Sequence, residues 1–257
     1  MQHSFDPIAF VFYGQPVSWY WLFYPLALLI VFFCTLKYSK KINSMVPGHA
    51  IIDFFTFLWI SIIVGGRLGY MLLYQPRLLV QDPAIIFSLQ MGGMSFHGAV
   101  IGVGIFLLLF YRIKKSNPIP ILDISLLFAP IALFLGRIGN FINGELAGRI
   151  TDVPWAMVFP IMDGYLRHPS QLYQAIAEGP VLFTLLYLSR NEKLRGFNTT
   201  LFVIYYSLLR IISECFRAPD NHIGYIATYF TYGQLLSFFF LLPCLIIFYL
   251  FYWPKLK

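Results

Sequence analysis

ISLLFAPIALFLGRIGNFINGELAGR, residues 124–149, joins an uncharged apolar run to a segment rich in hydrogen-bonding groups. Its last fourteen residues hold two arginines, two asparagines, one glutamate and four glycines. The apolar part has the composition of a membrane-spanning helix. Irregular polar backbone at membrane depth is tolerated only where it lines a cavity or contacts water. The stretch therefore predicts a transmembrane helix that ends at a polar, partly hydrated pocket.

The composition of the whole chain indicates an integral membrane protein. Of its 257 residues, 59% are hydrophobic and 11% are charged, whereas a soluble domain carries about 25% charged residues. A helix needs about 20 residues to cross a bilayer core, and seven apolar segments approach or exceed that length: 17–36, 54–74, 94–111, 119–141, 171–189, 197–216 and 223–253. Runs such as IGVGIFLLLF (101–110) do not alternate in polarity as barrel strands do. We therefore expect an all-α membrane protein with seven transmembrane helices.

The basic residues predict which way the chain faces. Lysines follow the first, third, fifth and seventh apolar segments, at Lys37, Lys40, Lys41, Lys114, Lys115, Lys193, Lys255 and Lys257. Short loops rich in Lys and Arg stay in the cytoplasm, so we expect an extracytoplasmic N-terminus and a cytoplasmic C-terminus. Topology then explains the net charge of +7, and a nucleic-acid-binding function, which needs a soluble basic face, is excluded. We expect one polytopic domain, 1–257, with a small extracytoplasmic cap at 144–170 between the fourth and fifth spans.

Ionisable residues inside apolar segments are candidate functional residues, because an arginine there costs about 2.5–3.5 kcal/mol on insertion scales. They are Arg67, His97, Arg137, Glu178, Arg210 and Glu214. The predicted topology places all of them except Glu178 in the outer half of the membrane, together with Tyr20, and assigns Glu178 to the inner half. Tyr206, Arg210 and Glu214 recur every four residues and share one helix face. Arg210 and Glu214 could simply satisfy each other, or Arg210 could belong to a larger site.

An excess of arginine at that depth predicts an anionic ligand. Arg67 and Arg137, on other helices, add positive charge that Glu214 cannot neutralise. A guanidinium stays charged when it is desolvated, and its planar fork suits a pair of phosphate oxygens. A glycine-capped helix end would explain the glycines of the opening stretch but not its other polar residues. We infer an anion-binding pocket that opens toward the outer leaflet.

His97, in MGGMSFHGAVIG (91–102), has two interpretations. It could hydrogen-bond between helices, or it could act beside the arginines as a general base or substrate ligand. The glycines around it let a backbone or a ligand approach closely. The histidines lack metal-ligand spacing, and Glu214 beside Cys215 opposes a catalytic thiolate in this chain.

Two other classes of function are open. An anion or lipid transporter or channel would need a polar path through the inner half of the membrane. That half is apolar apart from Asp53, Asp123 and Glu178. A structural scaffold would need the buried arginines for stability alone.

Motifs spread along the chain carry a resemblance to a known family. In order, they are FDP (5–7), WY (19–20), GGRLGY (65–70), GGMSFHG (92–98), GRIGNFINGELAGR (136–149), RHPSQLY (167–173), Tyr206 with Arg210, ECFRAPD (214–220) and GQLLS (233–237). They are similar to the motifs of the prolipoprotein diacylglyceryl transferases and cover essentially the whole chain. The chain departs from the family pattern at Trp21, Ala99, Ala147 and Ser207, and at Gln174, where the family usually has glutamate.

The resemblance implies a reaction and its participants. A diacylglyceryl group passes from phosphatidylglycerol to the lipobox cysteine thiol of a prolipoprotein signal peptide, a thioether forms, and glycerol phosphate leaves. The substrate protein supplies the nucleophile, and no cofactor or metal is implied. The expected location is the bacterial cytoplasmic (inner) membrane, with the active site facing the outer leaflet.

The resemblance also implies roles for individual residues. Arg137 would bind the lipid phosphate, Arg210 would bind it or stabilise the leaving group, and His97 would act as base or orient the thiol. Glu214 would orient Arg210, while Arg67 would hold the bundle or bind a second lipid. The remaining residues would shape the substrate pocket: Tyr20, Asn140, Asn143, Glu145, Gly148 and Tyr206.

Overall fold

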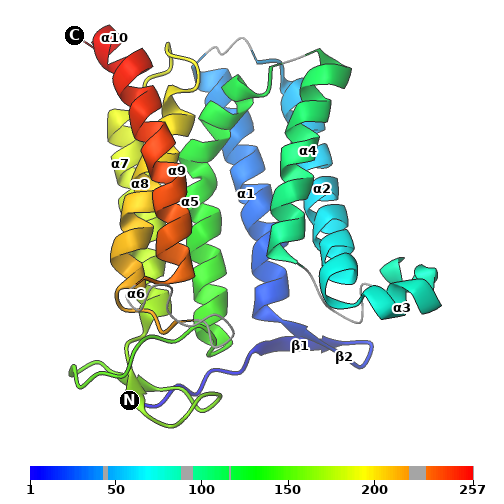
Figure 1. Cartoon of the computed structure of the whole chain (residues 1–257), viewed down its shortest axis with the longest axis vertical. Coiled ribbons are helices and arrows are strands. Elements are labelled where there is room, and N and C mark those ends of the chain that lie inside the picture. Colours follow the sequence, from blue (N-terminus) through cyan, green and yellow to red (C-terminus); the bar gives the residue numbers. More distant parts are fainter. Residues whose placement is uncertain (43–45, 88–94, 116, 220–229, 257) are drawn as a thin grey trace. The chain divides into compact units, whose positions relative to one another are not determined.

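The computed structural model describes residues 1–42, 46–87, 95–115, 117–219 and 230–256 (Figure 1). The chain forms two compact units. One comprises Met1–Tyr38 and Leu122–Lys257, and the other comprises Ser39–Ile121. We call them unit 1 and unit 2.

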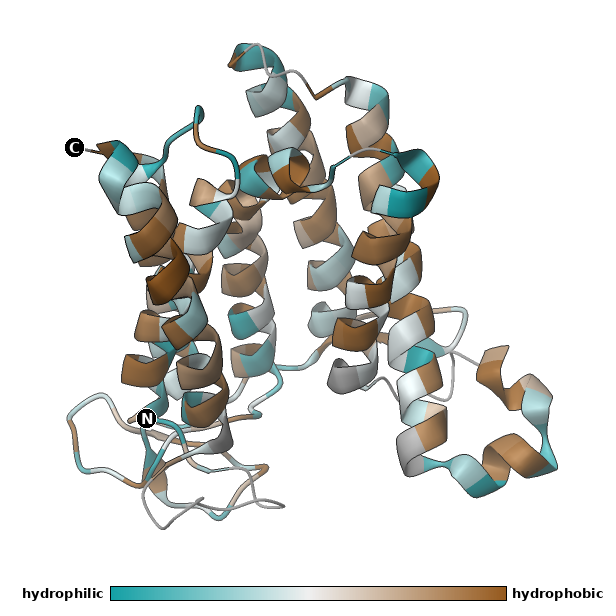
Figure 2. Cartoon of the chain, turned by 45° about the horizontal axis from the view of Figure 1, so that its top comes forward, coloured by the Kyte–Doolittle hydropathy of each residue, from teal (hydrophilic) through white to brown (hydrophobic). Residues whose placement is uncertain are grey.

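Helices occupy each of the seven predicted apolar segments. They are α1 (Trp19–Lys41), α2 (Gly48–Tyr74), α4 (Phe96–Lys114), α5 (Ile119–Ile142), α6 to α7 (Ser170–Ile176, η3 Ala177–Val181, Leu182–Ser189), α8 (Phe197–Glu214) and α9 to α10 (Tyr232–Ile247, η4 Phe248–Tyr252, Trp253–Leu256). Hydrophobic residues dominate along these helices, and hydrophilic residues gather near their ends (Figure 2). Among the described residues, four helices are long and apolar enough to cross a membrane: Trp19–Lys41, Gly48–Leu72, Ile119–Ile142 and Gly233–Leu256. The chain is therefore a mostly helical membrane protein.

In unit 1, α8 is the helix whose buried face carries the most polar groups. It packs between α7 and α9 (Figure 1). Its buried positions fall three or four residues apart, which is the spacing of one helix face, and they include Leu201, Ile204, Ser207, Arg210 and Glu214. Leu201 and Ile204 on this face pack in the core. Arg210 and Glu214 lie on the same face and are buried with them, so they are also held away from lipid.

The predicted span 171–189 is not one regular helix. It is interrupted by the π-helical turn η3, in which Gly179 has φ −95° and ψ −105°. Pro180 has no backbone N–H and its ring clashes with the preceding turn, which explains the break. Ser170, whose sequence context suggests an N-cap, is instead the first residue of α6, and its hydroxyl donates to the carbonyl of Leu146 at 3.0 Å.

Two short antiparallel strand pairs, which the sequence analysis did not anticipate, lie outside the helices. β1 (Ile8–Phe12) and β2 (Gln15–Ser18) form a hairpin, and β3 (Met157–Val158) pairs with β4 (Leu166–Arg167). The N-terminal residues are bound to the second pair, since His3 N donates to Val158 O at 2.9 Å and Val158 N donates to Met1 O at 2.8 Å. The chain start therefore helps to hold the loop region between α5 and α6 in place.

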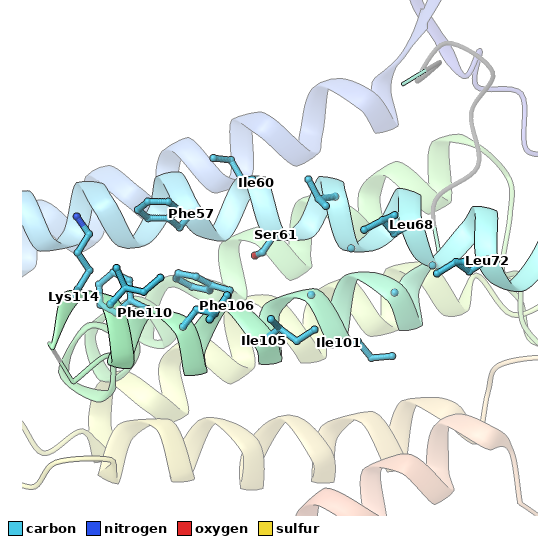
Figure 3. A pocket seen from close by; sticks show the side chains of 17 residues that line it. Phe57, Ile60, Ser61, Leu68, Leu72, Ile101, Ile105, Phe106, Phe110 and Lys114 are labelled. Carbon is cyan, nitrogen blue, oxygen red and sulfur yellow. The ribbon is translucent and has the colours of Figure 1, made fainter. Parts of the chain in front are cut away.

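Unit 2 depends on close contact between α2 and α4, which run side by side (Figure 3). A Cβ at Gly65, Gly69, Gly98 or Gly102 would collide with the backbone of the facing helix. Each helix thus presents glycines four residues apart, the pattern that lets membrane helices approach backbone to backbone. The backbone of α2 lies directly against Gly98, the glycine next to His97. The sequence left open whether a backbone or a ligand approaches there, and the structure shows a backbone.

We expect Gly102→Ala to lower the thermal unfolding temperature, because its Cβ would lie 2.5 Å from Ser61 O and 3.0 Å from the Cα of Gly65. Overpacking of this kind costs about 1–3 kcal/mol. Gly104→Ala, on the same helix, is the matched control, since its Cβ would meet nothing within 4 Å. It should leave the unfolding temperature unchanged or raise it, because glycine is a poor helix former. Equal unfolding temperatures for the two variants in detergent would contradict the close α2–α4 contact.

Candidate active site

Glu178 is the centre of a buried charge cluster in unit 1. Its carboxylate, 0% exposed, accepts from Arg137 at Oε2 (Nε, 2.9 Å) and at Oε1 (Nη2, 3.2 Å). Oε1 also accepts from Arg210 Nη1 at 3.1 Å. The assignment of Glu178 to the inner half of the membrane, apart from the arginines, is therefore wrong. Direct ion pairs to both arginines put it at their level.

Local backbone geometry brings these three side chains together. Glu178 lies in the π-helical turn η3, and a Cβ at the next residue, Gly179, would lie 2.8 Å from the Cβ of Phe134 on α5. The missing side chain therefore lets η3 approach α5 closely. Arg137 follows Phe134 by three residues, so it lies on the same face of α5 and reaches Glu178 across this contact.

Glu214, at the end of α8, is the second buried carboxylate of the cluster. It forms an ion pair with Arg210 Nη2, accepts from Arg217 Nη1 at 3.0 Å, and accepts from Thr231 Oγ1 at 3.0 Å. Thr231 also begins α9 through a capping box with Gln234. Arg210 thus pairs with Glu214, as one interpretation of the sequence predicted, and also belongs to the larger site, as the other predicted.

The described part of the cluster has more guanidinium groups than carboxylates. Its ion pairs join three guanidinium groups (Arg137, Arg210 and Arg217) to two carboxylates (Glu178 and Glu214). The sequence analysis overestimated the surplus because it did not count Glu178 as a partner of the arginines. An excess of guanidinium groups over carboxylates suits an anionic ligand.

The polar end of α5 forms a second, connected group. Glu145 Oε1 accepts from Asn140 Nδ2 at 2.7 Å and from Asn143 Nδ2 at 3.5 Å, and its backbone carbonyl accepts from Gln171 Nε2 at 2.6 Å. The turn is made by Gly144, with φ +70°, and by Leu146, with φ +58°. A positive φ at a leucine is an uncommon conformation that is often found at functional sites. These residues therefore meet at one place where α5 ends, as the sequence predicts.

Gly148 is packed too closely to carry a side chain. Its N–H donates to His168 O at 2.9 Å, its carbonyl accepts from Arg167 Nη1 at 2.8 Å, and a Cβ would collide with Phe216 O. Arg167 also donates to Asp163, and this hydrogen bond lowers the pKa of the Asp163 carboxyl to about 2. Gly148 therefore joins the loop region to the end of α8 and does not offer a functional group.

The tyrosines of the predicted site lie on helices of unit 1. Tyr20, on α1, shares a 2.6 Å hydrogen bond with Tyr24, and a Cβ at Gly139 would lie 2.9 Å from its ring. Gly139 thus lets Tyr20 approach α5 closely. Tyr206, on the same face of α8 as Arg210, stacks on Phe202 with a 5.8 Å ring separation.

Arg67 and His97 both belong to unit 2. Arg67, 4% exposed, donates to Ile86 O at 3.1 Å and to Ile85 O at 2.8 Å, and so holds the 3₁₀ helix η1 (Pro83–Phe87) to α2. This supports the structural alternative for Arg67. His97 lies in the first turn of α4, and its side chain is outside the described part of the structure.

An apolar groove of about 640 Å³ runs along α2 and α4 in unit 2 (Figure 3). Residues such as Phe57, Leu68 and Ile105 line it, and the polar members of its lining are Ser61 and Lys114. Lys114 is itself paired with Asp53 at 2.7 Å. The groove offers apolar surface but lacks the converging polar groups that chemistry at a phosphate requires.

Sequence analysis missed Gln171, Arg217 and Thr231 as members of the site. A usable signal was present for the first, because Gln171, Gln174 and Glu178 are three and four residues apart and share one helix face. Arg217 lies within the motif ECFRAPD, but its contact with Glu214 depends on the turn that ends α8. Thr231 is far from Glu214 in sequence, and no local pattern indicates their contact.

The fold and this cluster define a class: a polytopic helical membrane protein with a buried cluster of arginines paired with carboxylates. The family model for prolipoprotein diacylglyceryl transferase matches residues 7–250. The chain belongs to the prolipoprotein diacylglyceryl transferase family.

Relatives named for this activity match nearly the full length of the chain. Proteins named phosphatidylglycerol–prolipoprotein diacylglyceryl transferase from Rickettsia akari (strain Hartford) and Rickettsia typhi (strain ATCC VR-144 / Wilmington) are each 45% identical over 238 residues, which is 91% of this chain and 92% of the relative. The protein of that name from Rickettsia bellii (strain OSU 85-389) is also 45% identical, over 91% of this chain and 90% of its own.

We expect Glu178→Ala to destabilise the protein by about 3–5 kcal/mol, because it leaves a buried guanidinium without its carboxylate. Asp53→Asn is the control. It removes an ion pair whose side chains are 37% (Asp53) and 40% (Lys114) exposed, and such pairs contribute only about 0–1 kcal/mol. Thermal unfolding of both variants in detergent measures the difference. Similar small shifts for the two variants would show that Glu178 is not a structural partner of the arginines.

Proposed function

We propose that this protein transfers the diacylglyceryl group of phosphatidylglycerol to the lipobox cysteine thiol of a prolipoprotein, and releases glycerol phosphate. Family membership and the names of its relatives support this activity. They favour it over an anion or lipid transporter. The observation in the structure that carries the proposal is the pairing of Arg137 and Arg210 on one buried carboxylate, Glu178.

The chemistry requires stabilisation of a phosphate leaving group. The substrate thiolate attacks a glycerol carbon of the lipid, a C–S bond forms, and the C–O bond to the phosphate breaks with its electron pair staying on the phosphate oxygen. Guanidinium groups held in fixed positions stabilise the negative charge that develops there. The thiol proton must pass to a base, because the thiolate is the nucleophile.

Arg137 and Arg210 are paired with carboxylates but still have guanidinium N–H groups available to a phosphate. Each guanidinium has five N–H donors. Arg137 uses Nε and Nη2 on Glu178, and Arg210 uses Nη1 on Glu178 and Nη2 on Glu214. Within the described residues, Arg137 Nη1 and Arg210 Nε have no protein acceptor. The carboxylates therefore orient the guanidinium groups, and the remaining donors would bind the lipid phosphate.

The other residues take supporting roles in this proposal. His97 acts as the base or orients the thiol, and Glu214 orients Arg210. Arg67 remains outside the chemistry, consistent with its bonds to backbone carbonyls. The pocket around the headgroup is shaped by Tyr20, Asn140, Asn143, Glu145, Gly148 and Tyr206.

The proposal includes a location and a topology. The chain is a single polytopic domain of the bacterial cytoplasmic (inner) membrane, with seven spans and the N-terminus outside. Residues 144–170 form a cap on the extracytoplasmic side, and the active site faces the outer leaflet. The lysines after alternate apolar segments support this orientation, and the signal peptide with its lipobox cysteine is the protein partner.

Purified protein, phosphatidylglycerol and a lipobox peptide should give a diacylglyceryl adduct on the peptide, which mass spectrometry detects. Arg137→Ala should slow its formation at least about 100-fold, the loss typical of one removed oxyanion donor. Arg137→Lys should also form the adduct more slowly than the wild type, because an ammonium group cannot reproduce the bidentate geometry of a guanidinium. Arg112→Ala, an exposed arginine near the end of α4, is the control and should retain full activity. An absent wild-type adduct, or an undiminished adduct with Arg137→Ala, would refute the proposal.

The pH dependence of the rate distinguishes the two ways of activating the thiol. If His97 is the base, its neutral form is required, so the wild-type rate should rise with pH to a plateau. His97→Gln should lower the rate by about 100-fold or more and remove this ascending limb. A variant that keeps the ascending limb would instead assign thiol activation to the field of the arginines.

A further inference from the structure

Four buried amide atoms in unit 1 lack hydrogen-bond partners within the described part of the chain. They are Gln174 Nε2, Gln174 Oε1, Gln171 Oε1 and Asn143 Oδ1. Gln174 and Gln171 are both 0% exposed. Buried polar side chains are nearly always hydrogen-bonded, because an unmade bond costs free energy. Several unsatisfied atoms in one region therefore indicate a polar ligand.

These atoms form a row that leads to the arginine cluster. Both Gln171 and Asn143 contact Glu145. Gln171 Nε2 donates to the backbone carbonyl of Glu145 at 2.6 Å, and Asn143 Nδ2 donates to its Oε1 at 3.5 Å. Gln174 is one helical turn beyond Gln171 on the same face of α6, and Glu178 is one turn beyond Gln174. Gln174 thus lies between the polar end of α5 and the carboxylate that holds Arg137 and Arg210.

The free atoms include both a donor and acceptors. An amide offers an N–H donor and a carbonyl acceptor at once, and a hydroxyl group offers the same combination. An ammonium group, by contrast, has only donors and would leave Gln174 Nε2 unsatisfied. The chemistry of the row therefore matches a ligand with neighbouring hydroxyl groups.

Such a ligand is part of the proposed substrate. The headgroup of phosphatidylglycerol is a phosphate followed by a glycerol with two free hydroxyl groups. One helical turn, about 5.4 Å, separates Gln174 from Glu178, which is comparable to the length of a glycerol unit. A phosphate at Arg137 and Arg210 would bring the glycerol within reach of Gln174.

We propose that Gln174 binds the hydroxyl groups of the headgroup glycerol and, with Gln171 and Asn143, makes the site select a diol headgroup. This inference rests on the proposed function. It assigns headgroup recognition to neutral amides of α6 and α5, in addition to phosphate binding by the arginines.

The test compares two lipids that carry the same acyl chains. Phosphatidylpropanol keeps the phosphate and a three-carbon headgroup but lacks both hydroxyl groups, and it would transfer the same diacylglyceryl group. The wild-type protein should show a kcat/KM at least about tenfold higher with phosphatidylglycerol, the factor that one hydrogen bond typically supplies. Gln174→Met should lower kcat/KM about tenfold with phosphatidylglycerol and leave it unchanged with phosphatidylpropanol.

Two further variants and a stability measurement separate recognition from structure. Gln174→Glu should restore most of the preference, because a carboxylate also accepts from a diol. Gln81→Met, the same change at an exposed glutamine of α3 (Pro76–Gln81), should change kcat/KM with neither lipid. The unfolding temperature of Gln174→Met should be equal to or above that of the wild type, since an unsatisfied amide is replaced by an apolar chain of similar length.

The inference would be overturned if Gln174→Met lowered kcat/KM by the same factor with both lipids, so that the variant kept the wild-type preference for phosphatidylglycerol. A wild-type protein that forms no adduct with either lipid would refute the transferase function instead. Lipid retention measured by native mass spectrometry then decides the inference separately. The wild type should retain phosphatidylglycerol in preference to phosphatidylpropanol, and Gln174→Met should retain both equally.

Discussion

The pairing of buried guanidinium groups with buried carboxylates is the constraint on which unit 1 depends. Arg137 and Arg210 come from different helices, and both bind the fully buried Glu178. Charges removed from water are stable only when they are paired and hydrogen-bonded. The relative positions of α5, η3 and α8 are therefore coupled to one carboxylate, and the same contacts hold two cationic groups in defined orientations.

A backbone irregularity makes this pairing possible. A π-helical turn contains one residue more than an α-helical turn, and each residue advances an α-helix by about 100°. The η3 turn, which contains Glu178, thus shifts the faces of α7 relative to those of α6. Gly179 then allows the backbone to approach Phe134, and Pro180 fixes the break. The irregular geometry at 177–181 is best explained as a means of directing Glu178 toward α5 and α8.

Sequence patterns predicted what depends on local spacing. The helices, the Arg210–Glu214 pair, the turn at Gly144 and the meeting of Asn140 with Glu145 all follow from residues close in the chain. Glu178 was assigned to the wrong depth, although it is the eighth of the nineteen residues of the predicted span 171–189 and so belongs to the half that begins at Gln171. The bonds between the chain start and Val158, and the bond between Thr231 and Glu214, depend on contacts between distant segments, for which the sequence has no periodic signal.

The excess of guanidinium groups over carboxylates in the described part of the cluster suits the charge change of the proposed reaction. A phosphodiester in the lipid carries one negative charge, and the glycerol phosphate that leaves carries more as the C–O bond breaks. Only interactions that strengthen toward the transition state accelerate a reaction. Glu178 and Glu214 already occupy part of the guanidinium groups of Arg137 and Arg210. In the proposed reaction, the donors that the carboxylates leave free would bind the charge that develops on the departing phosphate, and this would favour the transition state over the bound lipid.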